Sequence, residues 1–308
     1  MLCQRPVHVH QGGVWELPGG KVKQGEDSLQ ALKRELSEEI NILVEHGHRL
    51  SSVDHDYPDR SIRLEAWVID GWSGTLNPNE DRPLEWVLIT DLDKRQLPAA
   101  NDRITKLLGL PSLYLITPDL QSYDDGFVTM TQEFIKNGLR FIQFRSKLST
   151  FTEHEQVVRR LVQICEKYSC RLIYNGSVEQ VTRLGAHGLH LSSTCLMQLQ
   201  DRPLPQDQWV VASCHDQLEI EHAAKIGVDF CVLSPVHKSS SHSVDNGMGW
   251  HKFNILATKA NIPVYALGGI QPGEIVEARS NGAHGVAMIS GVWDAPDPVA
   301  EIRKLNDE

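Results

Sequence analysis

The segment Gly20-Lys-Val-Lys-Gln-Gly-Glu26 is followed, after seven further residues, by Arg34-Glu-Leu-Ser-Glu-Glu39. The second segment places three carboxylates within one short stretch. An α-helix turns by about 100° per residue, so the side chains of Glu35, Glu38 and Glu39 would lie in one sector of a helix. Like charges this close destabilise an isolated helix. A hard divalent cation between them would compensate, because Mg²⁺ prefers oxygen ligands and often bridges to substrate phosphates.

The flanking residues predict that this helix follows a glycine loop. Gly19 and Gly20 permit positive φ angles and a close approach of the backbone. Asp27 or Ser28 can cap the helix N-terminus, and Asn41 tolerates the left-handed conformation that often ends a helix. A solvated acidic helix face is the simpler alternative for the three glutamates. The complete spacing of glycine, arginine and glutamate residues favours the metal site.

The string G-x5-E-x7-R-E-L-x-E-E resembles the Nudix box, with Asn41 where the box usually has glycine. The first hundred residues resemble the MutT-type branch of that family, the 8-oxo-dGTP diphosphatases. The matching segments, in chain order, are Trp15-Glu-Leu-Pro-Gly-Gly20, His55-Asp-Tyr-Pro-Asp59, Leu64-Glu-Ala-Trp67, Trp72-Ser-Gly74, Glu80, Trp86 and Leu97-Pro-Ala-Ala-Asn101. The resemblance implies hydrolysis of an oxidised purine nucleoside triphosphate to a monophosphate and pyrophosphate. Such an activity cleans the nucleotide pool that serves DNA replication and repair.

The resemblance also assigns a metal site and its cation, Mg²⁺ with Mn²⁺ as a possible substitute. The residues assigned to metal binding and catalysis are Gly19, through its carbonyl, Glu35, Glu38, Glu39 and Glu80. Arg34 is assigned to the catalytic group, and we expect it to pair with a nearby carboxylate such as Glu26.

Three further residues are assigned to the nucleotide: Arg5, His10 and Asn101. Asparagine suits recognition of a purine edge, because its amide offers both a hydrogen-bond donor and an acceptor. The alternative role for Asn101 is to cap a helix over residues 102–108. The two roles are compatible.

One departure from the family pattern concerns the N-terminus. The family begins with an apolar strand and a hairpin before the arginine that matches Arg5, whereas this sequence starts at Met1. We therefore expect either a true start that lies upstream, or an incomplete Nudix α/β/α sandwich whose first strand is missing, with an unpaired sheet edge.

Length and composition indicate two globular domains. The chain has 308 residues, of which 41% are hydrophobic and 23% charged, as is usual for water-soluble proteins. No apolar run approaches the ~20 residues of a membrane span, and no signal peptide is recognisable. The six cysteines show no metal-binding spacing, so we expect reduced thiols and a cytoplasmic protein. The net charge of −10 argues against stable nucleic-acid binding.

We place a Nudix domain at residues 1–109 and a second domain at residues 110–308. In the second domain, short apolar segments alternate with amphipathic runs such as Glu155–Tyr168 and Leu218–Ile226. The predicted strands are Tyr114–Ile116, Phe141–Phe144, Arg171–Tyr174, Gly188–His190, Val210–Ser213, Phe230–Leu233, Val264–Ala266 and Gly285–Ala287. Eight such units predict a (β/α)8 TIM barrel. A doubly wound sheet is the alternative from the pattern alone.

The second domain resembles thiamine-phosphate synthase and its relative TenI, the thiazole tautomerase. The matching segments are Gln143-Phe-Arg-Ser-Lys147, Leu172-Ile-Tyr-Asn-Gly176, Gly185-Ala-His-Gly-Leu-His-Leu191, Ala212-Ser-Cys-His215, Phe230-Cys-Val-Leu-Ser-Pro235, Ile262-Pro-Val-Tyr-Ala-Leu-Gly-Gly-Ile270 and Gly282-Ala-His-Gly-Val-Ala-Met-Ile-Ser290. The resemblance implies a site for a phosphorylated thiazole or pyrimidine. The residues assigned to it are Arg145, Lys147, Asn175, His215, Gly268, Gly269, Ile289 and Ser290.

Departures from both relatives limit the expected chemistry of the barrel. Thiamine-phosphate synthases place two metal-binding aspartates where this chain has Gly176 and the acid-free run Ser192–Cys195. TenI has its catalytic histidine where this chain has Pro235. We interpret His237, two residues after Pro235, and His215 as hydrogen-bonded neutral histidines. The barrel is thus expected to bind its ligand without making thiamine phosphate, or to serve as a partner domain. Two alternatives stay open: a thiamine-pathway enzyme with a vestigial Nudix half, and a non-catalytic ligand sensor.

Overall fold

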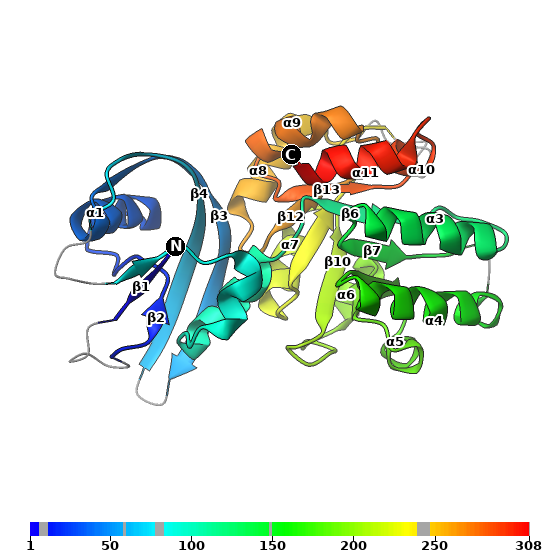
Figure 1. Cartoon of the computed structure of the whole chain (residues 1–308), viewed down its shortest axis with the longest axis horizontal. Helices are drawn as coiled ribbons and strands as arrows, with labels where there is room; N and C mark the ends of the chain where they lie inside the picture. The colour runs from blue at the N-terminus through cyan, green and yellow to red at the C-terminus, as the bar shows by residue number, and fades with distance from the viewer. Residues whose placement is uncertain (6–11, 58–59, 78–82, 148–149, 239–246, 308) are drawn as a thin grey trace. The chain divides into compact units, whose positions relative to one another are not determined.

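A computed structural model describes residues 1–5, 12–57, 60–77, 83–147, 150–238 and 247–307 (Figure 1). The chain divides into two compact units, Met1–Leu110 and Pro111–Glu308. None of the helices within these described ranges is long and apolar enough to cross a membrane.

The N-terminal unit contains two antiparallel sheets and two α-helices in its described part. Strands β1 (Leu2–Gln4), β2 (Trp15–Glu16) and β5 (Leu84–Glu85) form one sheet in the order β2-β1-β5. Strands β3 (Ile42–Tyr57) and β4 (Arg60–Gly74) form a long hairpin with three register shifts. The helices are α1 (Ser28–Ile40) and α2 (Asp102–Leu108), and the 3₁₀ turns are η2 (Ile89–Lys94) and η3 (Ala99–Asn101).

Helix α1 begins and ends as the sequence predicts. Of the two possible caps, Asp27 is the one used: its carboxylate accepts from the Gln30 backbone at 2.8 Å, and the Gln30 side chain accepts from the Asp27 N–H at 2.9 Å. This reciprocal capping box satisfies two donors that the first helical turn would otherwise leave open. Asn41 ends the helix at φ 58°, in the left-handed region.

A small apolar cluster holds α1 against the β3–β4 hairpin. Leu36 and Ile40 from the helix pack with Ile42 and Val44 from β3, and all four are buried. Because this face of α1 is apolar, the acidic residues that alternate with it are directed away from the cluster.

The C-terminal unit is a closed barrel of eight parallel strands, which confirms the predicted TIM barrel; the doubly wound sheet is wrong. The strands are β6 (Leu113–Ile116), β7 (Phe141–Phe144), β8 (Arg171–Asn175), β9 (Gly188–Leu191), β10 (Trp209–Cys214), β11 (Phe230–Leu233), β12 (Val264–Ala266) and β13 (Gly285–Met288). Each includes its predicted segment. Barrel closure needs β9 paired with β10 and β13 paired with β6, and both pairings are present.

Helices follow the strands around the barrel. They are α3 (Asp125–Lys136), α4 (Phe151–Lys167), α5 (Val178–Leu184), α6 (Ser193–Gln198), α7 (Gln217–Lys225), α8 (Gly249–Lys259), η5 (Pro272–Glu274), α9 (Ile275–Ser280), α10 (Ser290–Trp293) and α11 (Pro298–Asp307). The helix predicted from Glu155 begins earlier, at Phe151, because Thr150 and Glu153 form a capping box that extends it by a turn.

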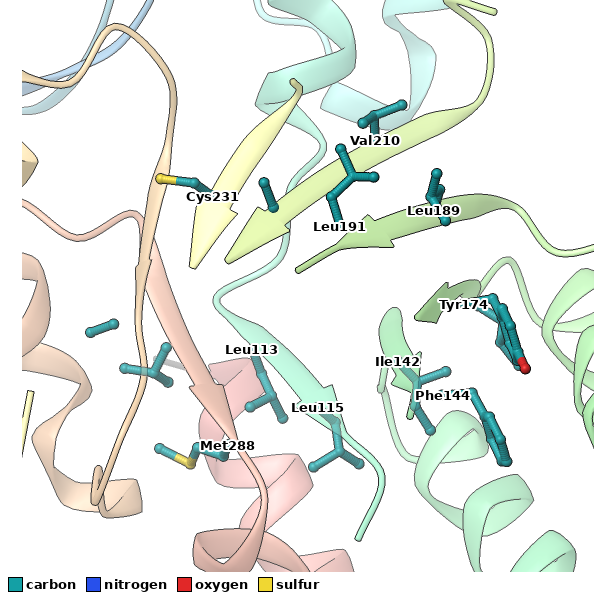
Figure 2. Packing of buried hydrophobic residues seen from close by; sticks show 14 of the residues in the cluster. Leu113, Leu115, Ile142, Phe144, Tyr174, Leu189, Leu191, Val210, Cys231 and Met288 are labelled. Atoms are coloured by element: carbon teal, nitrogen blue, oxygen red, sulfur yellow. The ribbon is translucent and has the colours of Figure 1, made fainter. Parts of the chain in front are cut away.

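Alternate strand residues build two separate apolar layers. Leu113 and Leu115 project from the same side of β6 into the layer between strands and helices, together with Ile142 and Phe144 of β7 (Figure 2). Tyr114 projects to the other side and forms edge contacts with Phe230 and Tyr265 inside the barrel. The period-2 alternation of strands explains both layers.

Candidate active sites

The glycine loop of the N-terminal unit lies directly against the acidic helix. A Cβ atom at Gly20 would come within 2.1 Å of the Glu35 carboxyl carbon, so the Glu35 carboxylate occupies the space that a side chain at position 20 would need. Gly19 adopts φ 150°, which L-residues rarely adopt. A side chain at position 20 would therefore need the Glu35 carboxylate to move, and glycine suits the backbone conformation at position 19.

Arg34 is the centre of an ion-pair network on α1. Its guanidinium donates to both carboxylate oxygens of Glu26, at 2.7 and 3.1 Å, which confirms the expected pair. It also donates to Glu35 at 2.7 Å and to Glu38 at 3.3 Å, and to the Lys21 carbonyl at 3.1 Å. The hydrogen bond from Arg34, followed by one from the backbone, lowers the pKa of Glu26 to about 2. Arg34 thus stays charged and fixed by Glu26.

The acidic residues fit a hard cation by type. Glu35, Glu38 and Glu39 lie on consecutive turns of α1 and offer only oxygen ligands, the kind that Mg²⁺ prefers. In the residues that the structure describes, no three acidic, histidine or cysteine side chains converge as a metal site. Two of the carboxylates are instead directed to Arg34. Glu80 lies outside the described residues.

The predicted nucleotide-binding residues are only partly described. Arg5 forms an ion pair with Glu16, and His10 lies outside the described residues. Asn101 ends η3 and is only 8% exposed. It stands at the first position before α2, but its side chain makes no capping hydrogen bond, so the side-chain cap is wrong.

The ends of β6 and β7 bring two of the predicted barrel residues together. Arg145 donates to Asp119 at 3.1 Å, and the Lys147 backbone N–H donates to the same carboxylate at 2.9 Å. Thr117 at the end of β6 donates to the Arg145 carbonyl at 2.8 Å. The two cationic residues are therefore anchored at the carboxyl ends of the strands, the face on which barrel enzymes carry their active sites.

Position 176 has no room for a longer side chain. A Cβ at Gly176 would lie 2.3 Å from the Gln180 side chain and 2.4 Å from the Tyr174 ring. Asn175, its predicted neighbour in the site, is the last residue of β8 and is half-buried. An aspartate at 176 would require movement of both neighbours. The packing around Gly176 therefore leaves no space for the metal-binding aspartate expected at this position in a synthase.

Each barrel histidine singled out from the sequence is hydrogen-bonded to a glutamate. His215 Nδ1 lies 3.0 Å from a carboxylate oxygen of Glu219, which also accepts from the His215 backbone at 2.7 Å. His237 Nε2 lies 2.8 Å from Glu274. The expectation that both histidines are hydrogen-bonded is confirmed, and their neutral state stays a prediction.

The last two strand ends form adjoining loops. Gly268 and Gly269 follow β12 with φ 103° and 69°, conformations that glycine adopts at little cost. Ile289 and Ser290 follow β13, and a Cβ at the next residue, Gly291, would lie 3.0 Å from the Ile270 carbonyl. The two loops are thus in contact, which suits a phosphate cradle built from backbone N–H groups.

A buried polar network inside the barrel was not assigned from the sequence. Gln143 Nε2 lies 2.7 Å from His190 Nδ1, and His190 Nε2 lies 2.8 Å from the Ser213 hydroxyl. Tyr114 joins through its hydroxyl, 3.2 Å from His190 Nδ1. Burial, and then the charge of Arg145, lower the pKa of His190 to about 3. The signal was present as a single polar residue within the apolar strands Phe141–Phe144 and Gly188–Leu191.

These contacts set the tautomer of His190. The amide of Gln143 donates to Nδ1, so the hydrogen of the neutral ring lies on Nε2, which donates to Ser213. Ser213, near the end of β10, is the partly exposed member of the network.

Comparisons with known proteins place both units. Residues 113–292 match the family model for thiamine monophosphate synthase, and residues 1–107 match the NUDIX domain model. The thiamine-phosphate synthase of Thioalkalivibrio sulfidiphilus is 29% identical over 64% of this chain and 94% of its own length. The putative thiamine-phosphate synthase 2 of Aquifex aeolicus is 33% identical over 59% of this chain and 98% of its own.

The N-terminal unit has its own relative. The 8-oxo-dGTP diphosphatase of Escherichia coli is 33% identical over 33% of this chain and 80% of its own length.

The solved thiamine phosphate pyrophosphorylase from Pyrococcus furiosus matches 64% of this chain and 94% of its own, with a TM-score of 0.53 and 23% identity, and so shows the barrel fold alone. The chain therefore belongs to the thiamine monophosphate synthase family through residues 113–292, and it carries a Nudix domain in residues 1–107.

Proposed function

We propose that the Nudix domain hydrolyses oxidised purine nucleoside triphosphates, converting 8-oxo-dGTP to 8-oxo-dGMP and pyrophosphate. The observation that carries the proposal is the packing of Glu35 on Gly20 beside the Arg34 ion pairs, since it joins the glycine loop to the acidic helix. The similarity to the E. coli 8-oxo-dGTP diphosphatase supports the choice of nucleotide. The enzyme would encounter this substrate in the cytoplasm.

The proposed cofactor is Mg²⁺, with Mn²⁺ as a substitute, because Nudix hydrolases generally use divalent metals. Gly19, Glu35, Glu38, Glu39 and Glu80 would hold it. When bound, such a cation offsets phosphate charge and makes water more acidic. Arg34 keeps two bonds to Glu26 and its bond to the Lys21 carbonyl if it releases the other carboxylates, so its position does not depend on them.

Substrate selection is proposed to rest on Asn101, with Arg5 and His10 also contacting the nucleotide. Asn101 is nearly buried and its side chain is not used to cap α2. A buried amide needs hydrogen-bond partners, and a purine edge offers both a donor and an acceptor. Overall, water attacks phosphorus and one phosphoanhydride P–O bond breaks, with pyrophosphate as the second product.

A direct assay tests this function. The full chain would be incubated with 8-oxo-dGTP or dGTP and Mg²⁺, and release of pyrophosphate and monophosphate would be measured. The expected result is turnover of 8-oxo-dGTP in preference to dGTP, abolished by a chelator. Equal turnover of both nucleotides would reject the proposed substrate, and the absence of any turnover would reject the hydrolase.

For the barrel, we infer a binding site for a phosphorylated thiazole or pyrimidine. The adjoining loops at Gly268–Gly269 and Ile289–Ser290, with Arg145 and Lys147 in the loop after β7, support an anionic ligand. The packing at Gly176 argues against the metal-binding aspartate of a synthase. The rival proposals are a thiamine-pathway enzyme and a partner domain without a ligand. Binding of the phosphate ester without synthesis would support our proposal, synthesis would support the thiamine-pathway enzyme, and no binding would support the partner domain.

A further inference from the structure

His237 lies beside the glycine turn that follows β12. A Cβ on Gly269 would come within 2.8 Å of the His237 Cβ and 2.9 Å of the Lys238 carbonyl. The His237 backbone N–H donates to the Gly268 carbonyl at 2.9 Å, so the segment after β11 is hydrogen-bonded along the turn. The histidine and the turn therefore form one local structure at the carboxyl ends of β11 and β12.

The ring of His237 is held from two sides. Nε2 lies 2.8 Å from Glu274 Oε1, and the Trp250 ring of α8 meets the imidazole edge to face at a centroid distance of 5.5 Å. Glu274 is itself fixed, because its other oxygen accepts from the Gln271 backbone at 2.7 Å. A carboxylate oxygen only accepts hydrogen bonds, so Nε2 carries the hydrogen and Glu274 fixes the orientation of the ring.

The second ring nitrogen, Nδ1, is two bonds from the His237 Cβ, the atom that a side chain on Gly269 would meet. When both nitrogens carry hydrogen, Nε2 donates to Glu274 and Nδ1 becomes a second, charged donor. His237 remains 35% exposed, so solvent molecules and small anions reach it.

We propose that His237, oriented by Glu274, is a cationic hydrogen-bond donor for the phosphomonoester that the Gly268–Gly269 turn binds. The ligand class is a phosphate monoester or inorganic phosphate. The inference deepens the proposed function of the barrel and rests on it. The groups around the ring are Glu274 from η5, the uncharged Trp250 from α8, the turn itself, which has no side chains, and Lys238 next in the chain.

The test uses the full chain and inorganic phosphate as the probe. Amide and histidine side-chain ¹⁵N NMR spectra would be recorded during a phosphate titration of the wild type, His237→Phe, Glu274→Gln and the control His251→Phe. His251 is exposed on the same α8. Phenylalanine at 237 keeps a ring against Trp250 and removes both nitrogens. Unchanged amide positions outside the turn would verify that each variant is folded.

The expected result is a shift of the Gly268 and Gly269 amides on phosphate addition, with the His237 ring driven to its doubly protonated form. His237→Phe should weaken phosphate binding by about tenfold, the loss expected for one charge-assisted hydrogen bond. Glu274→Gln should weaken it less, and His251→Phe should leave it unchanged. Phosphate binding at the turn with equal affinity in His237→Phe would overturn this proposal and leave the barrel ligand site standing. If the Gly268 and Gly269 amides of the wild-type chain do not respond to phosphate, both the His237 proposal and the barrel ligand site are overturned.

Discussion

The backbone of Gly20 and the carboxylate of Glu35 occupy adjacent space, such that a Cβ at position 20 would come within 2.1 Å of the Glu35 carboxyl carbon. This contact sets where a carboxylate of the acidic helix can stand relative to the glycine loop. Gly20→Ala must therefore displace either the loop or Glu35. A displacement of about 1 Å at a catalytic group can cost roughly a hundredfold in rate.

We expect Gly20→Ala to lower kcat/KM for 8-oxo-dGTP by about tenfold to a hundredfold with little change in thermal stability. The matched control is Gly109→Ala at the end of α2, where a Cβ would meet its nearest neighbour at an ordinary 3.5 Å. Steady-state kinetics of both variants would check it. Equal activity of the two would show that the Gly20–Glu35 contact has no role in the reaction.

Glu39→Gln should lower kcat for 8-oxo-dGTP by about a hundredfold or more, because it removes a negative charge from the proposed cation site. Glu45→Gln, at an exposed position of β3, is the control. Mg²⁺ titrations followed by calorimetry would accompany the kinetics, and weaker Mg²⁺ binding in Glu39→Gln alone is expected. Unchanged kcat in Glu39→Gln would remove Glu39 from the metal site.

Asn101→Ala should reduce the preference for 8-oxo-dGTP over dGTP. The loss of a bidentate amide contact should cost about 1–3 kcal/mol in kcat/KM for the oxidised base. Because Asn101 is buried, thermal unfolding would be measured alongside, to separate an effect on stability from an effect on selectivity. If kcat/KM falls by the same factor for both nucleotides, Asn101 supports the fold and does not read the base.

The sequence predicted most of what depends on local pattern. The eight barrel strands were recognisable because each is a short apolar run between amphipathic helices, and the ends of α1 followed from Asp27 and Asn41. The direction of the Glu35 and Glu38 carboxylates toward Arg34 could not be predicted, because it depends on rotamers and on Glu26 eight residues away. Long-range partners set such details.

The His190 network shows the same limit inside the barrel. Its members lie on four different strands, β6, β7, β9 and β10, and only closure of the barrel brings them together. The polar residues in apolar strands were visible in the sequence, but their mutual hydrogen bonds were not.

That network makes the stability of the barrel depend on pH. Burial lowers the pKa of His190 to about 3, whereas an unfolded histidine titrates near 6.5. The folded state therefore prefers the neutral ring, and this contribution to stability is complete above pH ~6.5 and is lost as the pH falls toward ~3. Urea unfolding between pH 7 and 4, followed by tryptophan fluorescence, should show a decline in the free energy of unfolding.

His190→Gln should flatten that decline, since it removes the titrating group while keeping an amide donor and acceptor. His251→Gln, at an exposed position on α8, is the control and should retain the wild-type slope. A His190→Gln slope equal to that of the wild type would mean that other groups carry the pH dependence.

The barrel should not form thiamine phosphate at a rate comparable to that of an active synthase. Two positions carry this expectation: Gly176, where a Cβ would lie 2.4 Å from the Tyr174 ring, and the run Ser192–Cys195, which offers no carboxylate. A Mg²⁺–pyrophosphate leaving group needs anionic ligands, and without them its charge would develop uncompensated. The full chain and the Thioalkalivibrio sulfidiphilus thiamine-phosphate synthase would be assayed side by side with thiazole phosphate and pyrimidine pyrophosphate, and thiazole phosphate binding would be measured by calorimetry. Binding without product formation is the expected outcome. Turnover similar to that of the synthase would show that this barrel holds pyrophosphate without the two aspartates, and it would make the thiamine-pathway enzyme the better proposal.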